Sequence, residues 1–271
     1  MARKNDVGTV DRVISLIRLL AESEGLMSIR RVSTALSLPP STVHRMLEQL
    51  TAQDLVFYDR SIHRYSLGPE LYRIGCLIVA RHPLATIAEP VLQEITRQTG
   101  EASILGLLLP KQRRMIFASK VDSDKRLRYR IDLNQPITLV KGASGRTILA
   151  YLPEEDINAC IAEEGKELGG KAQALKLKQD LAEIRTNGYG FSQGSRIPGA
   201  VGFAVPLFSA RNEIFGSLCL TIPEQRYDPR TRKTLLSILT SGGRKLSEML
   251  GAHVTAPDRT RSTSATKRQT K

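Results

Sequence analysis

The first 50 residues contain three segments in which apolar side chains recur at the three- and four-residue spacing of an amphipathic helix. The first segment, with Thr9 as a candidate N-cap, has its stripe at Val10, Val13, Ile14, Ile17 and Leu20. The second is shorter, from Ile29 to Leu36, with Ser28 as its candidate cap. The third has its stripe at Val43, Met46, Leu47 and Leu50. This pattern predicts three short helices in close succession.

Only Ser37 and Leu38 separate the second predicted helix from the prolines that open the third. Pro39 and Pro40 suit a first helical turn, because the N–H groups there have no intrahelical partner. Two helices joined this closely predict a helix-turn-helix, whose second helix enters the DNA major groove. A surface helix without a special role would carry a similar polar face, so the neighbouring elements decide. The side chains expected to contact base edges are Ser41, Thr42, His44, Arg45 and Gln49.

Residues 55–58 and 64–67 have the composition of two short strands, with a polar turn over residues 59–63. Alone, this hairpin would be an ordinary solvated one. Directly after a helix-turn-helix it predicts a wing that places cations on the DNA backbone. The side chains expected at the backbone, from the wing and the second helix, are Arg30, Arg31, Arg60, His63 and Arg64.

The remaining chain alternates between helical and strand patterns. Helices are expected over residues 68–82, 83–99, 147–151, 154–164, 172–186 and 229–250, and strands over 102–109, 115–121, 127–131, 202–208 and 215–222. At and just before the third of these strands stand the cations Lys125, Arg126, Arg128 and Arg130. They are interpreted as a solvated face, with a secondary contact to DNA or a partner as the alternative. An antiparallel sheet with helices on its faces makes the fold class α+β.

The net charge of +13 suggests a polyanionic partner, but its distribution does not point to the helix-turn-helix. Residues 1–70 have a net charge of only +1, residues 71–253 of +8, and residues 254–271 of +4. Any contact with DNA must therefore depend on individual side chains. Residues 252–271 have almost no apolar side chain and are expected to form a disordered, basic, solubilising tail. Non-specific attraction of this tail to DNA is the alternative.

A length of 271 residues suits one large domain or two ordinary ones. The chain has no apolar run of membrane-spanning length and no apolar stretch of signal-peptide type after Met1. Its isolated cysteines, Cys76, Cys160 and Cys219, suit a reducing compartment. We therefore expect a soluble cytoplasmic protein that makes no contact with a membrane.

The sequence offers little for catalysis or metal binding. It has no HExxH, GxSxG or zinc-ligand spacing, and its four histidines lie outside the predicted second-domain core. Cys219, within an apolar strand, is interpreted as a buried small residue. We expect no catalytic residues, no metal and no cofactor. The turn over residues 142–146 opens a helix and can hold an anion on its N–H groups, although many helices begin this way.

Three stretches together carry a family resemblance: residues 10–20, residues 38–47 (LPPSTVHRML) and residues 64–68 (RYSLG). The chain resembles the IclR family of bacterial transcription regulators along nearly its whole length, to about Gly251. The resemblance implies a winged helix-turn-helix over residues 8–67, a linker and dimerisation helix over 68–82, and a GAF/PAS-like effector-binding domain over 83–251. Residues 252–271 remain as the tail. Pro40 stands where many members have Lys or Arg, so one phosphate contact is expected to be missing.

The resemblance also implies an effector pocket lined by Gly142, Ala143, Ser144, Arg196, Gly202, Cys219 and Thr221. Residues 202, 219 and 221 stand where members often have Cys, Ser and Ser, and residues 195–199 lack an acidic residue that is frequent there. These departures predict a bulkier or more apolar ligand than glyoxylate or pyruvate. Arg196 either pairs with a ligand carboxylate or is a loop arginine in water, and the second interpretation is favoured.

The expected function is a ligand-responsive, sequence-specific DNA-binding transcription regulator. It would act on a palindromic operator as a homodimer or tetramer, and control a catabolic or metabolic operon in response to a small organic or aromatic acid. Whether it represses or activates is left open. The alternative is a small-molecule, redox or enzymatic sensor whose helix-turn-helix serves only for dimerisation.

Overall fold

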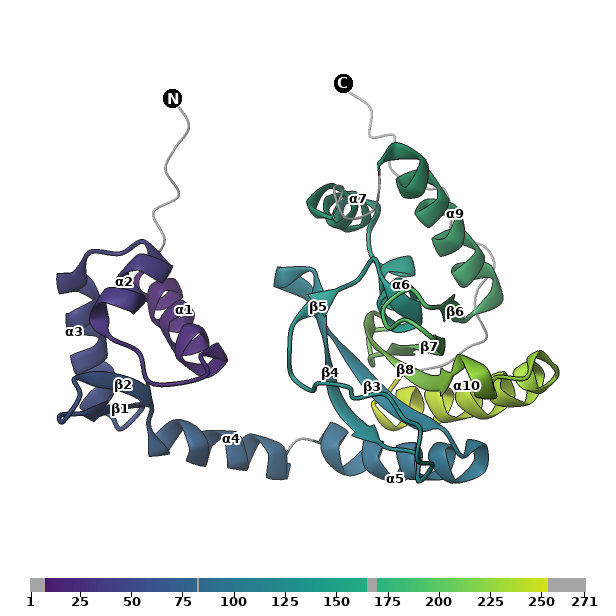
Figure 1. Ribbon diagram of the computed structural model, residues 1–271, viewed down its shortest axis with the longest axis horizontal. Helices are drawn as coiled ribbons and strands as arrows, with labels where there is room; N and C mark the ends of the chain where they lie inside the picture. The colour runs from purple at the N-terminus through teal and green to yellow at the C-terminus, as the bar shows by residue number, and fades with distance from the viewer. Residues whose placement is uncertain (1–7, 82, 165–169, 253–271) are drawn as a thin grey trace, which may run out of the picture. The chain divides into compact units, whose positions relative to one another are not determined.

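The computed structural model describes residues 8–81, 83–164 and 170–252. Contacts divide the chain into two compact units, and the boundary between them in the sequence lies after residue 82. Each unit is described by itself (Figure 1). The expected tail lies outside the described residues except for Ala252, which is buried and donates its N–H to the carbonyl of Ser247. No helix in the described part of the chain is long and apolar enough to cross a bilayer.

The first unit contains the predicted order of elements. These are α1 (Thr9–Glu22), α2 (Ile29–Leu36), α3 (Pro40–Thr51), β1 (Val56–Asp59), β2 (Arg64–Leu67) and α4 (Pro69–Arg81). The Ser28 cap is confirmed, since its hydroxyl accepts the N–H of Arg31 at 3.2 Å. The Thr9 cap is wrong, because α1 begins at Thr9 itself and Gly8, which has no side chain, occupies the cap position.

The core of this unit forms where α1, α2 and α3 face the hairpin. The predicted stripe of α3 is buried throughout. The stripe predicted for α1 is only partly right: Leu20 is buried, but Val10 and Ile14 are 71% and 41% exposed, and Leu16 is buried instead. The buried face of α1 is therefore rotated from the predicted one, and an apolar strip near its start faces outward.

The turn between α2 and α3 is fixed by the backbone and one serine. Ser37 adopts a left-handed conformation with φ of 54°, which reverses the chain. The N–H of Leu38 donates to the carbonyl of Ser33 at 3.1 Å, and the Ser33 hydroxyl donates to the carbonyl of Leu38 at 2.6 Å. This pair of hydrogen bonds closes the turn that the spacing of the two helices predicted.

The second unit is built on one six-stranded antiparallel sheet with strand order β5-β4-β3-β8-β7-β6. Its strands are β3 (Ala102–Leu109), β4 (Arg114–Val121), β5 (Ile137–Thr138), β6 (Gly190–Gln193), β7 (Ala200–Phe208) and β8 (Ile214–Pro223). Its α-helices are α5 (Pro83–Thr99), α6 (Gly142–Ala150), α7 (Glu154–Glu163), α9 (Lys171–Asn187) and α10 (Arg232–Met249). Short 3₁₀ turns are η1 (Pro110–Gln112), η2 (Glu224–Arg226) and η3 (Pro229–Thr231).

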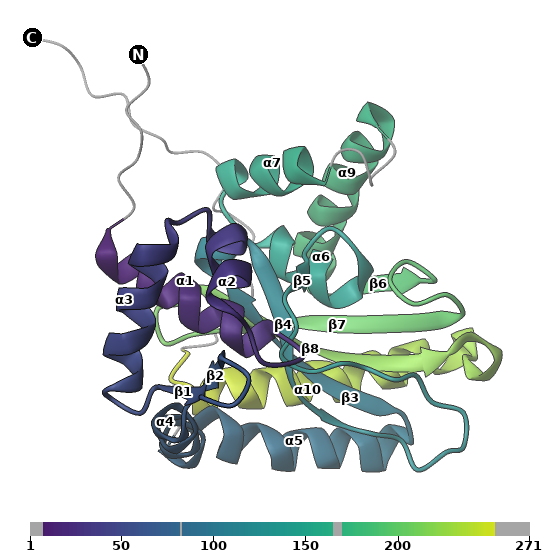
Figure 2. The same ribbon diagram turned by 60° about the vertical axis from the view of Figure 1, so that its left-hand side comes forward.

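Helices cover both faces of this sheet (Figure 2). α5 and α10 pack on one face around Leu92, Phe203 and Leu239. α6, α7 and α9 lie on the other side, around Ile148 and Leu181. Successive strand side chains point to opposite faces, so β7 contributes Phe203 to the first core and Ala204 to the second. The α+β class predicted from the sequence is confirmed.

Three elements differ from the sequence-based expectation. Residues 127–131 are not a strand, and the sheet is completed at that edge by β5 instead. The alternation of cations there reflects local contacts, because Arg128 donates to the carbonyl of Ser123 and Arg130 pairs with Asp132. β6 was not predicted, since GFSQ has no apolar alternation. α6 begins at Gly142 rather than at Thr147.

Candidate functional site

The outward side of α3 carries the side chains expected at the bases. Ser41, His44, Arg45 and Gln49 are exposed and Thr42 is half-buried, while the apolar stripe holds the opposite side in the core. The His44 Nδ1 atom lies 3.3 Å from a carboxylate oxygen of Glu48, one turn further along the same face. Four of these five side chains are thus accessible on one side of the helix, as a groove-reading helix requires.

The hairpin carries its cations at the tip. Arg60, His63 and Arg64 are exposed, as are Arg30 and Arg31 at the start of α2. The Tyr58 hydroxyl lies 2.6 Å from His63 Nδ1, and a guanidinium nitrogen of Arg64 donates to the carbonyls of Ile62 and His63. The tip is therefore ordered by its own side chains, with the charges at the surface.

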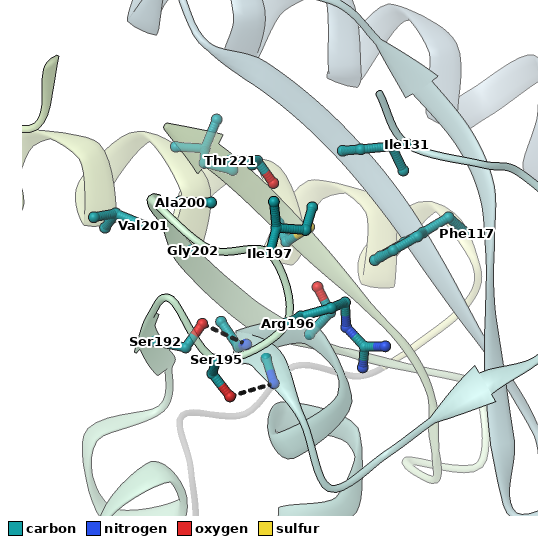
Figure 3. A pocket seen from close by; sticks show the side chains of 15 residues that line it. Phe117, Ile131, Ser192, Ser195, Arg196, Ile197, Ala200, Val201, Gly202 and Thr221 are labelled. Atoms are coloured by element: carbon teal, nitrogen blue, oxygen red, sulfur yellow. Dashed lines mark hydrogen bonds between the residues drawn. The ribbon is translucent and has the colours of Figure 1, made fainter. Parts of the chain in front are cut away.

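The second unit contains a cavity, partly open to solvent, beside the start of α6. All seven residues expected at the pocket line it, namely Gly142, Ala143, Ser144, Arg196, Gly202, Cys219 and Thr221. Figure 3 labels Arg196, Gly202 and Thr221 among them. The structure thus brings residues from α6, β7, β8 and the loop before β7 to one place.

The position of α6 depends on a glycine. A Cβ on Gly145 would lie 2.7 Å from the carbonyl oxygen of Leu139, closer than such atoms approach. Only glycine lets the first turn of α6 pack this tightly on the chain that precedes it. The start of the helix is therefore fixed at the edge of the cavity.

Two serines that the sequence did not indicate complete this edge. The N–H of Gly142 donates to the Ser195 hydroxyl at 3.1 Å, and the N–H of Ala143 donates to the Ser192 hydroxyl at 2.9 Å. The expectation that these N–H groups are open for an anion is therefore wrong. Each serine accepts from the backbone and still has its own hydroxyl hydrogen to donate, and both residues line the cavity.

Arg196 is not the solvated loop arginine that the sequence favoured. Its guanidinium donates to the carbonyls of Thr138, at 2.7 Å, and Lys141, and burial lowers its pKa. Among the described residues no carboxylate forms an ion pair with it. Both hydrogen bonds come from one nitrogen, Nη2, and carbonyl oxygens carry no net charge that would neutralise the guanidinium. The Glu164 carboxylate favours the charged form, but its effect is smaller than that of burial. A cation of this kind at a cavity favours an anionic ligand.

The opposite walls are apolar. Phe117, Ile131 and Ile197 line them, whereas the side chains of Val201 and Leu220 belong to the core on the other face of the sheet. A Cβ at Gly202 would lie 3.1 Å from the Ser192 hydroxyl and 3.4 Å from the Ala143 methyl, so a larger side chain there would fill this part of the cavity. The cavity therefore has a cationic, hydroxyl-lined side and an apolar side.

The thiol of Cys219 faces this cavity but is a poor nucleophile. Burial raises its pKa to about 11, against the smaller opposing effect of the Ser144 hydroxyl. At neutral pH it is protonated, whereas the thiolate is the reactive form. His44 and His63 lie in the first unit. No cluster of potential metal ligands occurs within the described ranges.

Both units match known protein families. The chain matches the family models for the IclR helix-turn-helix domain, over residues 9–60, and for the bacterial transcriptional regulator IclR C-terminal domain, over residues 76–248. It is 25% identical to the HTH-type transcriptional regulator BhcR of Paracoccus denitrificans, over 89% of this chain and 86% of that one. It is 23% identical to the transcriptional repressor IclR of Escherichia coli, over 81% of each.

Solved structures share the fold. An IclR transcriptional regulator from Silicibacter sp. TM1040 has a TM-score of 0.81 at 22% identity and covers 93% of this chain and 100% of its own. An IclR homologue from Microbacterium hydrocarbonoxydans, solved in complex with 4-hydroxybenzoate, has a TM-score of 0.69 at 17% identity, with 90% and 99% covered.

The raised pKa of Cys219 predicts a pH dependence. A thiol whose folded-state pKa lies above its unfolded value of about 9 contributes stability below that pH and loses it as the pH rises toward 11. The free energy of unfolding of the second unit, measured with urea, is therefore expected to fall between pH 8.5 and 10.5. This fall should be larger in the wild type than in Cys219→Ala by about 1 kcal/mol or more. Cys76→Ala, which removes an exposed thiol, is the control and should match the wild type. Equal pH dependence in all three proteins would contradict the assignment.

Proposed function

The chain belongs to the IclR family of bacterial transcriptional regulators, and from this premise we propose that it reads a palindromic operator with α3 and its wing while an organic acid in the cavity sets its affinity for DNA. As a member of this family it is a ligand-responsive DNA-binding regulator and not an enzyme. The observation that carries the ligand proposal is the unneutralised Arg196 cation at the cavity.

The ligand class follows from the two sides of the cavity. A carboxylate would meet Arg196 and the hydroxyls of Ser192 and Ser195, in charge-assisted hydrogen bonds. An aromatic or branched apolar body would pack on Phe117 and Ile131. We therefore propose an aromatic or similarly bulky monocarboxylic acid. The complex of the Microbacterium homologue with 4-hydroxybenzoate supports this class.

The DNA-binding form is proposed to be a homodimer. One helix-turn-helix reads only a few base pairs, so a two-fold dimer on a palindrome gains affinity from linkage. Apolar side chains exposed in the first unit support a protein partner: Val10 and Ile14 on α1, and Tyr72 and Ile78, 78% and 57% exposed, on α4. A two-fold dimer uses the same surface on both subunits, so the partner that we propose is a second copy of this chain.

The DNA contacts make a matched pair of variants informative. If Arg45 reads a base, Arg45→Ala is expected to cost about 1–3 kcal/mol on the operator and to relax the preference at one base step. If Arg64 contacts a phosphate, Arg64→Ala is expected to weaken operator and random DNA alike and to lower the salt slope by about one. Fluorescence anisotropy over a salt series measures both. An equal loss on operator and random DNA for Arg45→Ala would reduce Arg45 to a backbone contact.

The acid site is tested by calorimetry with benzoate, 4-hydroxybenzoate and glyoxylate. The aromatic acids are expected to bind, and Arg196→Gln is expected to weaken them by at least about tenfold, because a hydrogen-bonded charge contact is lost. Arg97→Gln, at an arginine on α5 whose side chain is 72% exposed, is the control and should leave affinity unchanged. Tight binding of glyoxylate with none of the aromatic acids would refute the proposed ligand class.

The dimer is tested on the exposed face of α4. Tyr72→Asp and Ile78→Asp place a charge in the proposed interface and are expected to weaken self-association by at least about tenfold, since an unpaired buried charge costs several kcal/mol. Analytical ultracentrifugation gives the dissociation constant. Leu175→Asp, which changes a side chain 61% exposed on α9, is the control. A wild-type monomer, or a dimer unaffected by both α4 variants, would contradict the proposal.

A further inference from the structure

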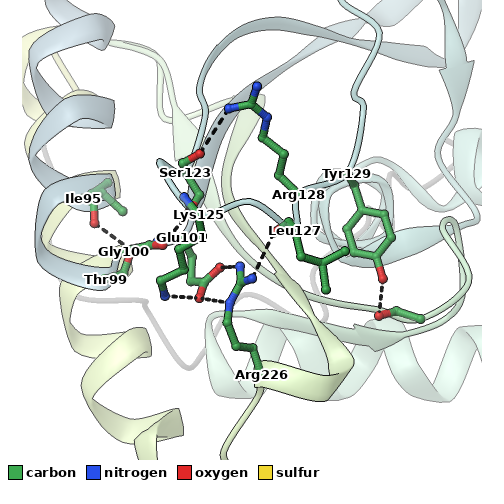
Figure 4. Close-up of polar contacts among 11 residues, drawn as sticks. Ile95, Thr99, Gly100, Glu101, Ser123, Lys125, Leu127, Arg128, Tyr129 and Arg226 are labelled. Carbon is green, nitrogen blue, oxygen red and sulfur yellow. Dashed lines mark hydrogen bonds and ion pairs between the residues drawn. The ribbon is translucent and has the colours of Figure 1, made fainter.

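A segment without helix or strand follows β4 and ends at the cavity. We call residues 123–131 the strap. Ile131 at its end is 6% exposed and lines the cavity. The hydroxyl of Tyr129 donates to the carbonyl of Gly199, in the loop that carries Arg196 (Figure 4). The strap therefore contacts the opposite wall directly.

The strap is anchored by a carboxylate that lies outside the cavity. Glu101 lies between α5 and β3, and its side chain is only 7% exposed. It accepts two hydrogen bonds from the guanidinium of Arg226 in η2, and Lys125 of the strap contacts it at 2.8 Å (Figure 4). One buried anion thus holds cations from two separate segments. A buried pair of this kind is strongly disrupted when one partner is removed.

Arg226 extends the connection to both walls. Its third nitrogen donates to the carbonyl of Leu127 in the strap at 2.9 Å. Its neighbour in η2, Glu224, donates its backbone N–H to the carbonyl of Gly199 at 2.7 Å and accepts a hydrogen bond from the side chain of Gln193. η2 therefore ties the strap and residues 193–199, which include Ser195 and Arg196, to the same point. The hydrogen bonds that Arg226 donates to Glu101 raise the pKa of Arg226.

We propose that Glu101 and Arg226 form a latch that holds the strap and residues 193–199 closed over the cavity and so controls access to it. Neither residue lines the cavity, so both are positioning residues. With the latch intact, a ligand exchanges slowly. Without it, the walls separate more often and Arg196 is placed less accurately. The effect on ligand exchange rests on the proposed function, whereas the closure itself does not.

The buried thiols provide a measurement of closure that needs no ligand. Cys219 lines the cavity and Cys160 does not, yet both are 3% exposed and burial raises the pKa of both to about 11. Opening of the strap exposes only Cys219, while global unfolding exposes both. Mass spectrometry resolves the alkylation rate of each cysteine with iodoacetamide in the intact protein.

Glu101→Gln is expected to raise the alkylation rate of Cys219 by at least about tenfold and to leave that of Cys160 unchanged. Tyr129→Phe, which removes only the hydrogen bond to Gly199, is expected to act in the same direction by a smaller factor and keeps the test available if Glu101→Gln folds poorly. Glu94→Gln, in an exposed ion pair with Arg97 on α5, is the matched control and should have no effect.

Two results would overturn the latch: unchanged Cys219 rates in Glu101→Gln and Tyr129→Phe, or a parallel rise at Cys160, which would make Glu101 a residue of general stability. These outcomes are distinct from a failure of the proposed function. If calorimetry finds no acid that binds, the ligand proposal fails, but the alkylation rates still decide whether Glu101 closes the cavity.

Discussion

The site in the second unit depends on the docking of residues 192–196 onto the start of α6. A helix start that packs against protein must have its unpaired backbone groups satisfied by side chains, because water reaches them poorly. Here Ser192 and Ser195 accept the N–H groups of Ala143 and Gly142, and Arg196 donates to the carbonyls of Thr138 and Lys141. Three side chains from residues 192–196, at and after the end of β6, thus form hydrogen bonds with the backbone of another segment.

This docking satisfies hydrogen bonds but leaves an electrostatic imbalance. The helix start brings partial positive charge to the cavity, and Arg196 adds a full one with only neutral oxygens as partners. In a partly desolvated place such a charge favours an anion from outside. The serines matter as much as the arginine. Each hydroxyl accepts a backbone N–H of the helix, so its own hydrogen is available for donation to a bound anion. The apolar walls then select among anions by the shape of the remaining molecule.

The sequence predicted the elements whose pattern is local and missed the contacts that are not. Helical spacing identified α2 and α3, because one buried face dictates it, and the family resemblance identified the seven pocket residues. Ser192 was missed because its partner Ala143 is 49 residues away and no periodicity links them. The strand expected at residues 127–131 was wrong, because its alternating cations contact separate local partners. Between them, the Tyr129 hydroxyl donates to the carbonyl of Gly199. The predicted buried face of α1 differs from the observed one for a similar reason. Val10 and Ile14 fit helical spacing, but spacing alone does not tell whether an apolar side chain faces the core, solvent or a partner.

Regulation requires that a ligand bind two states of the protein with different affinity. The cavity alone does not supply two states, since a rigid pocket would bind the acid without changing anything else. The latch proposed at Glu101 would supply a second state on opening, because this buried carboxylate, through Lys125 and Arg226, holds the strap to the rest of the unit. That carboxylate follows directly after α5, and α5 follows the α4 segment of the first unit in the chain. A ligand that bridges Arg196 and the strap would stabilise the closed arrangement in which Glu101 holds its two cations. Such a ligand would contact the closed arrangement more extensively than the open one, which is the difference in affinity that linkage demands.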